Sequence, residues 1–138
     1  MIKKKSLGYF EYDPVIYPLK LWVHVGNGLS ELIDSCFDGC KAPDEDYYGV
    51  TYDDAVRKRD RRRGVLISFQ HTKDMLMDYC CHEASHACDA IEDAIGMEHG
   101  GEPSAYLIGW IASCINKARL GIGDFIEVED IKDKENSS

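Results

Sequence analysis

The sequence has no hydrophobic run long enough to cross a membrane, because none approaches the roughly 20 apolar residues that a spanning helix needs. The basic start of the chain, residues 1–13, has no apolar run behind it, so we expect no secretory signal. Basic residues are scarce, with 16 lysines and arginines against 25 acidic residues and a net charge of −9. General nucleic-acid binding needs a basic footprint. We therefore expect a cytoplasmic protein that binds neither nucleic acid nor membrane.

Cysteines are present, but they lack the spacing of a zinc ribbon. Cys36 and Cys40 are separated by three residues, and no second pair lies at the distance that such a site requires. Cys80 and Cys81 are adjacent and would point about 100° apart on a helix, so they cannot easily clamp one ion. In a reducing compartment we expect the six cysteines to be free thiols, most of them small buried side chains.

The length of 138 residues fits one domain with its own hydrophobic core. Residues 15–25 alternate between apolar and polar positions and predict a half-buried strand. A short helix is expected over residues 29–37, and two more strands over 47–52 and 64–70. The acidic segment 124–138 is expected to be a C-terminal tail, so the predicted domain covers residues 1–123.

A basic run at residues 57–63 interrupts the acidic composition. It lies between two predicted strands and ends at Gly64, which favours a solvated hairpin connection. A contact with an acidic protein partner is the alternative. The acidic surface could likewise serve a protein contact.

The strongest predicted helix covers residues 72–95. Thr72 is a candidate N-cap and Gly96 a candidate C-cap. Apolar residues recur every three or four positions along this segment and predict a core stripe, formed by Leu76, Cys80, Ala84, Ala87, Ile91 and Ile95. A second helix is expected from Glu102 to about residue 119. Together these elements predict an α+β domain in which a small sheet of about three strands packs on the two helices.

The first of these helices contains the pattern H-E-x-x-H at residues 82–86. Positions i and i+4 share a helix face, so His82 and His86 can present two imidazole nitrogens to one zinc ion. Glu83 is displaced by about 100° around the helix, where its carboxylate can reach a water on the metal and act as a general base. The pattern therefore predicts a zinc site.

A catalytic zinc site needs a third protein ligand, and several residues are candidates. The metzincin continuation would require glycine at 89 and histidine at 92, but the chain has Asp89 and Glu92. His99 lies in the turn between the helices. Glu102 begins the next helix, where a stripe with the small residues Gly109 and Ser113 predicts close packing against the first helix. We favour Glu102 on this ground, with His99 as the alternative.

These motifs carry a resemblance to a known family. HEASH at 82–86, a glycine-ended helix and GEPSAYLIGWI at 101–111 resemble the gluzincins, and the layout is similar to ImmA/IrrE-type metallopeptidases. It is also similar to small HExxH proteins of tailed phages and prophages. The resemblance covers about residues 64–118 and implies a zincin-like domain with zinc as cofactor. It implies His82, His86 and Glu102 as ligands and Glu83 as base.

Other residues near the motif have less definite roles. Asp89 and Asp93 follow His86 by one and two turns and could hydrogen-bond a ligand imidazole, although solvated positions are the alternative. Tyr106 could donate a hydrogen bond to a developing oxyanion, although a packed aromatic is the alternative. An extended peptide could pair with strand 64–70 if that strand lies at the sheet edge.

Three functional hypotheses follow. The first is a zinc metallopeptidase that hydrolyses a peptide bond of a peptide or protein substrate. The second is a non-catalytic binding or assembly protein of phage origin that keeps the scaffold. In the third, His82 and His86 are polar residues on a buried helix, where they would need partners.

Overall fold

The computed structural model describes residues 7–128 of the chain. In this range the chain forms six strands, three α-helices and one short 3-10 helix, η1. Their bounds are β1 (Gly8–Tyr12), β2 (Lys20–Val25), α1 (Leu29–Cys36), β3 (Phe37–Asp38), β4 (Gly49–Arg57), β5 (Arg63–Phe69), η1 (Thr72–Asp74), α2 (Met77–Ile95), α3 (Gly101–Arg119) and β6 (Asp124–Glu127). No helix of this range is long and apolar enough to cross a membrane.

The six strands form one mixed sheet in the order β3-β4-β5-β2-β1-β6. β2 and β5 are parallel, and all the other neighbours are antiparallel. The prediction of a small sheet of about three strands, as part of a zincin-like domain, is therefore wrong. The chain does combine helices with a largely antiparallel sheet. β1, β3 and β6 were not predicted, because each is short and because Phe37 of β3 fell within the helix expected over residues 29–37.

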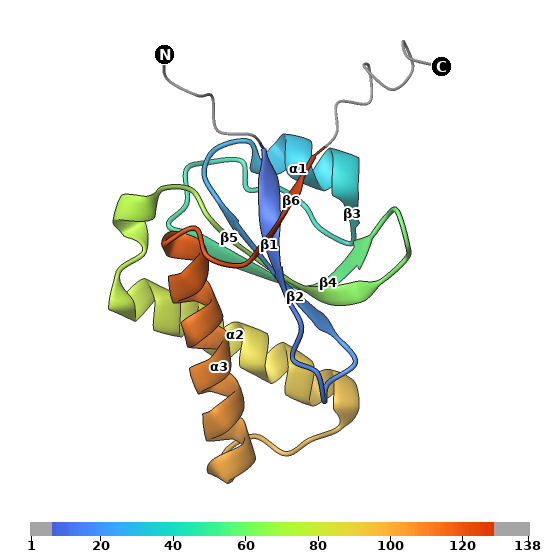
Figure 1. Ribbon diagram of the computed structural model, residues 1–138, viewed down its shortest axis with the longest axis vertical. Helices are drawn as coiled ribbons and strands as arrows, with labels where there is room; N and C mark the ends of the chain where they lie inside the picture. Colours follow the sequence, from blue (N-terminus) through green and yellow to red (C-terminus); the bar gives the residue numbers. More distant parts are fainter. Residues whose placement is uncertain (1–6, 129–138) are drawn as a thin grey trace.

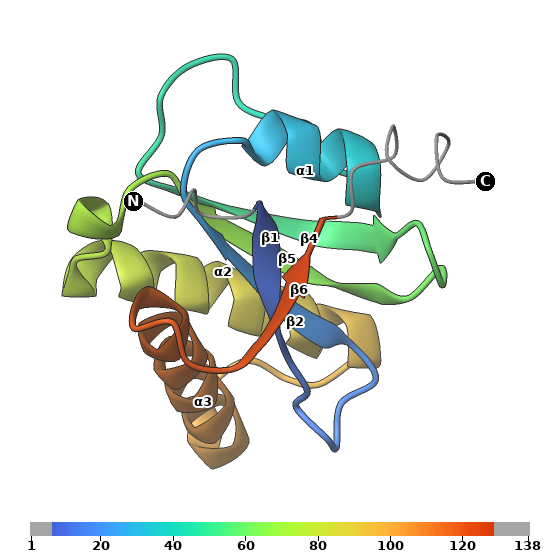
Figure 2. The ribbon, with the colours of Figure 1, turned by 45° about the horizontal axis from the view of Figure 1, so that its top comes forward.

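The sheet separates two hydrophobic cores, because helices cover both of its faces. Figure 2 shows α1 on one face and α2 with α3 on the other. Leu21 and Val23 of β2 face the core beneath α2 and α3, whereas Trp22 faces the core beneath α1. Trp22 is fully buried and His24 is 2% exposed. The half-buried strand expected over residues 15–25 is thus shorter, Lys20–Val25, and is a central strand buried on both faces, since α1 covers the face expected to be exposed.

The helix that carries the HExxH pattern begins later than expected. Thr72 starts η1 rather than capping α2, and Leu76 occupies the N-cap position of α2. The predicted end is confirmed, since Gly96 adopts the left-handed conformation with φ 71° and donates its N–H to the carbonyl of Asp93. Leu76 is 55% exposed and Ile95 is 38% exposed, so the buried stripe of α2 is shorter than predicted at both ends.

The predicted close packing of the small residues of α3 is wrong. Gly109 has open space where a Cβ would stand, and Ser113 is exposed. Leu107, Ile111 and Ile115 form the buried face of α3 instead. These larger apolar side chains lie on the opposite side of the helix and gain more from burial than glycine or serine would.

The segment that the sequence analysis separated as an acidic tail begins with a strand. Asp124–Glu127 forms β6, which pairs antiparallel with β1. Figure 1 shows β6 returning from the end of α3 to lie beside β1. The remainder of the predicted tail, residues 129–138, lies outside the described residues.

The basic run at residues 57–63 forms the connection between β4 and β5, as the hairpin interpretation predicted. Arg57 is 5% exposed and donates from Nη1 to Glu11 Oε1 at 2.7 Å. Its Nε and Nη2 atoms donate to the two carboxylate oxygens of Asp60. Arg61 forms an ion pair with Asp38 at 2.6 Å. Much of the positive charge of the run is therefore neutralised within the chain.

Candidate metal centre

The two histidines of the HExxH pattern converge on α2. Their Nε2 atoms lie 3.1 Å apart, and the ring centroids are 4.6 Å apart with an interplanar angle of 80°. The one-turn spacing in a regular helix brings the rings together. The His82 side chain is 65% exposed, so a solute can reach the pair from outside.

Glu83 is held in a fixed position between α2 and β4. It is 6% exposed, and its Oε1 accepts a hydrogen bond from Thr51 Oγ1 at 2.8 Å. The other oxygen, Oε2, lies 4.0 Å from His82 Nε2. A Cβ on Gly49 would stand 3.0 Å from Glu83 Cγ, so the glycine lets the carboxylate side chain lie directly against the strand.

A cavity of about 440 Å³ lies over this pair of elements. His82, Glu83 and His86 line it together with Asp89 and Asp93 of α2, and β4 contributes Gly49, Val50, Thr51 and Asp53. The cavity is therefore built by the HExxH helix and one strand. Its lining contains more carboxylates than the HExxH pattern alone provides.

The strand beside the cavity is an edge strand along half its length. Gly49–Tyr52 pairs with β5 on one side, whereas β3 pairs only with Val56 and Arg57. Among residues 7–128 no strand covers the outer side of Gly49–Tyr52. β5 lies between β4 and β2, so residues 64–70 do not form the edge strand considered from the sequence.

Two residues predicted for the site lie elsewhere on α3. Glu102 is exposed in the first turn of α3, and Tyr106 is 76% exposed. Neither residue lines the cavity around Glu83. Both residues lie on the exposed face of α3, so the structure does not bring them to the histidine pair. The exposure of Tyr106 also excludes the packed-aromatic interpretation.

A second group of ligand-type side chains lies one turn further along α2. Asp89, Glu92 and His99 offer ligand atoms that all lie within 4.8 Å of one another, and among the described residues they are the one such group of three. His99 Nδ1 is 3.1 Å from Glu92 Oε2, and its Nε2 is 2.9 Å from Asp93 Oδ1. His99 has thus turned toward α2, but it contacts these acids rather than the His82–His86 pair.

Hydrogen bonds keep the buried carboxylate of Glu92 ionised. Burial alone would raise the pKa of Glu92, but hydrogen bonds from Cys88, Ser104 and His99 outweigh it and hold that pKa below its ordinary value. The pKa of His99 is raised, because Asp93, Glu92 and Asp89 together outweigh its desolvation. The group is therefore an internally satisfied ion-pair network.

The cysteines near the site are free thiols, as are the other cysteines of the chain. Cys88 is buried beside Glu92, and burial followed by the hydrogen bond to Glu92 raises its pKa to about 12. A thiol with this pKa is protonated at neutral pH and is a poor metal ligand.

In comparisons with protein-family models, with curated proteins and with solved structures, nothing matches this chain. The assignment of the site therefore depends on its geometry and on the resemblance of the motifs.

Sequence reasoning missed the part of the site that comes from β4. Thr51 and Gly49 lie more than 30 residues before Glu83, and no local pattern links them to it. The glycine within an expected strand was the one available signal, because such glycines often mark a close approach of another element.

Proposed function

We propose that this chain is a zinc-dependent metallopeptidase in which His82 and His86 bind the metal and Glu83 is the general base. The observation that carries the proposal is the convergence of two Nε2 atoms beside a buried, hydrogen-bonded glutamate. Two exposed histidines alone would be an ordinary surface feature.

The donor set fits zinc. Two nitrogens bound to one tetrahedral zinc ion at about 2.0–2.1 Å stand about 3.3 Å apart, and the two Nε2 atoms are separated by 3.1 Å. Imidazole nitrogen is a preferred donor for Zn²⁺, whereas Mg²⁺ and Ca²⁺ prefer oxygen. Small rotations of the side chains would be enough to place one ion between the rings.

The position of Glu83 suits proton transfer. Bound zinc would polarise the scissile carbonyl and make water more acidic. Thr51 occupies Oε1 of Glu83, which leaves Oε2 on the histidine side to accept the proton of the attacking water. The same carboxyl group then donates that proton to the amine as the peptide C–N bond breaks. Thr51 is a positioning residue in this scheme, because it fixes the direction of the carboxylate.

The exposed edge of β4 supports an extended peptide as the substrate. The unpaired side of Gly49–Tyr52 borders the same cavity as Glu83. Backbone groups of an edge strand pair readily with an added strand. A peptide bound in this way would pass over the histidine pair.

A second candidate function is a non-catalytic zinc-binding scaffold that serves binding or assembly. The observation that favours it is the position of Glu102 on the exposed face of α3, which leaves the histidine pair without its expected third ligand. The two functions make different predictions for Glu83, because only catalysis needs the carboxylate to accept a proton.

The test combines metal analysis with peptide hydrolysis. Protein purified without chelators should contain about one zinc per chain by elemental analysis. His82→Ala and His86→Ala should lose the metal, whereas Glu83→Gln should keep it and lose at least 100-fold in hydrolysis of a peptide library. Glu31→Gln on α1 is the matched control and should match the wild type. Zinc-free wild-type protein would contradict both functions, and an active Glu83→Gln variant would contradict catalysis by this base.

The same assay identifies the third ligand. Glu102 is the residue that the family resemblance implies, whereas Asp89 already lines the cavity. If Glu102 completes the site, Glu102→Gln should weaken zinc binding by at least tenfold while Asp89→Asn binds normally. The reverse result would identify Asp89 as the third ligand.

A further inference from the structure

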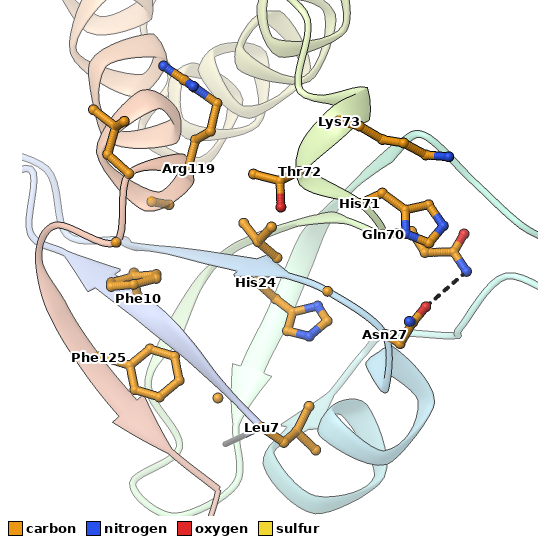
Figure 3. Close-up of a pocket in the computed structure, with 16 residues that line it drawn as sticks. Leu7, Phe10, His24, Asn27, Gln70, His71, Thr72, Lys73, Arg119 and Phe125 are labelled. Carbon is orange, nitrogen blue, oxygen red and sulfur yellow. Dashed lines mark hydrogen bonds between the residues drawn. The ribbon is translucent and has the colours of Figure 1, made fainter. Parts of the chain in front are cut away.

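A cleft larger than the cavity over Glu83 lies away from the candidate metal centre. Its volume is about 1060 Å³, and none of its lining residues lines the cavity over Glu83. It is formed by the ends of β1 and β6, the end of α3, the turn after β2 and the start of η1 (Figure 3). Binding pockets for compact organic ligands have volumes of about 300–1,000 Å³. The cleft is thus large enough for such a molecule.

One side of the cleft is apolar and open to solvent. Figure 3 shows the rings of Phe10 and Phe125 together on this side. The two rings have an edge-to-face arrangement with centroids 5.1 Å apart. Phe125 is 46% exposed and Leu120, at the end of α3, is 54% exposed. An apolar ligand in the cleft would remove this surface from water.

The charged residues of the cleft are all basic. Among residues 7–128, Lys73 and Arg119 line it and no aspartate or glutamate does, although acidic residues outnumber basic ones by 25 to 16 in the chain. Among the described residues neither side chain forms an ion pair, and Arg119 donates to the side-chain oxygen of Asn116. In Figure 3 the charged ends of both residues point away from the other side chains that line the cleft. Both residues are exposed, so these long side chains can turn over a bound anion.

Hydrogen bonds connect polar side chains on the other side of the cleft. His24 is 2% exposed, and its Nδ1 is 2.7 Å from Ser68 Oγ, which in turn lies 2.8 Å from the Tyr47 hydroxyl. Burial lowers the pKa of His24 to about 4, so its ring is neutral at pH 7. Gln70 donates to Asn27 on the same side, as the dashed line in Figure 3 shows. The net charge of the cleft therefore comes from Lys73 and Arg119.

We propose that this cleft binds a small organic anion whose apolar body packs against Phe10 and Phe125 and whose charge is neutralised by Lys73 and Arg119. The favourable contributions are burial of exposed aromatic surface and placement of a negative charge beside the two basic side chains that line the cleft. A neutral ligand would gain only the first contribution.

The test uses the whole 138-residue chain and two probes of similar size. The anionic probe is 8-anilinonaphthalene-1-sulfonate, and N-phenyl-1-naphthylamine is its uncharged counterpart. Binding is followed by calorimetry and by ¹H–¹⁵N NMR. We expect saturable one-to-one binding of the anion, with shift changes concentrated at Phe10, His24 and Phe125. The affinity should fall as salt is raised, because exposed charges are screened.

Matched variants separate the two contributions. The double variant Lys73→Gln/Arg119→Gln should bind the anionic probe about tenfold more weakly, since each exposed charge contributes on the order of a factor of three to the affinity. It should leave the neutral probe unchanged. Phe125→Ala should weaken the binding of both probes. Lys117→Gln is the control, because it removes a charge from the last turn of α3 outside the cleft lining.

Three results would overturn the proposal. The first is the absence of saturable binding. The second is a set of NMR shifts spread over other exposed apolar residues, such as Met77 and Ile16, rather than over the cleft. The third is equal affinity of the wild type and the double variant for the anionic probe. None of these results bears on zinc binding by His82 and His86.

Discussion

At the scale of single residues, Glu83 and His24 are buried ionisable groups that line the two cavities, and they differ in their surroundings. Glu83 is buried with a hydrogen bond from Thr51 and keeps one oxygen directed to the histidine pair. His24 is buried with a hydroxyl partner, and burial favours its neutral form. The oriented carboxylate of Glu83 is suited to chemistry or to recognition. The buried His24 ring, which must stay neutral, makes the stability of the fold sensitive to acid.

His24 should make the protein less stable as the pH falls. Its pKa is about 4 in the folded state and about 6.5 in the unfolded chain. Between these values the unfolded state binds more protons, so the free energy of unfolding decreases with decreasing pH, by about 2–4 kcal/mol in total. Chemical denaturation at pH 4.5 and pH 7 should show a smaller difference for His24→Asn than for the wild type. Equal differences in the two proteins would refute this role.

At the scale of elements, the site depends on how closely α2 approaches β4. Gly49 has no side chain to separate them, so Glu83 lies directly against the strand. The buried Arg57 at the other end of β4 bonds Glu11 of β1 and Asp60 of the hairpin, which holds that end of the strand in place. The edge that faces the cavity is thus fixed at one end by packing and at the other by ion pairs.

Replacing Gly49 should disturb the position of Glu83 without touching the histidines. A Cβ at this position would stand 3.0 Å from Glu83 and 3.0 Å from the Phe69 ring, so Gly49→Val must move one of them. We expect a loss of about 1–3 kcal/mol in the free energy of unfolding, measured by urea denaturation. Gly109→Ala is the control, because its Cβ enters open space on α3 and should stabilise the helix by about 0.5–1 kcal/mol. A harmless Gly49→Val would show that the two elements are not closely packed.

At the scale of the whole molecule, one sheet supports two cores. Leu32 of α1 is fully buried in the core on one face, and Ile111 of α3 is fully buried in the core on the other. The strands β2 and β5 contribute side chains to both cores, so neither core can form without the sheet between them. We therefore expect the described part of the chain to unfold as one unit.

This arrangement predicts how core substitutions combine. Leu32→Ala and Ile111→Ala should each destabilise the protein by about 2–5 kcal/mol. The effects should add to within about 0.5 kcal/mol, because the two residues lie on opposite faces of the sheet. Thermal unfolding of each single variant, followed by circular dichroism, should remain a single transition. Two separate transitions would show that the cores unfold independently.

The sequence by itself determined the local features of this protein. The spacing of His82 and His86 is enough to bring two imidazoles together, because helical periodicity is a local property. Gly96 marked the end of α2 correctly because only the residue at that position must adopt the left-handed conformation. The alternation along residues 15–25 correctly separated the two faces of β2, because the alternation of side chains along a strand is also a local property.

Only the tertiary structure decided which faces are buried and which segments meet. Glu102 and Gly109 are exposed because the opposite side of α3 packs inward. That side buries more apolar area, since it carries Leu107, Ile111 and Ile115. The burial of Trp22 depends on α1. This helix covers the face of β2 that the alternating sequence of the strand predicts to be exposed to solvent. The contacts of Thr51 and Gly49 with Glu83 join segments about 30 residues apart, and such contacts are set by the packing of the whole chain rather than by any local pattern.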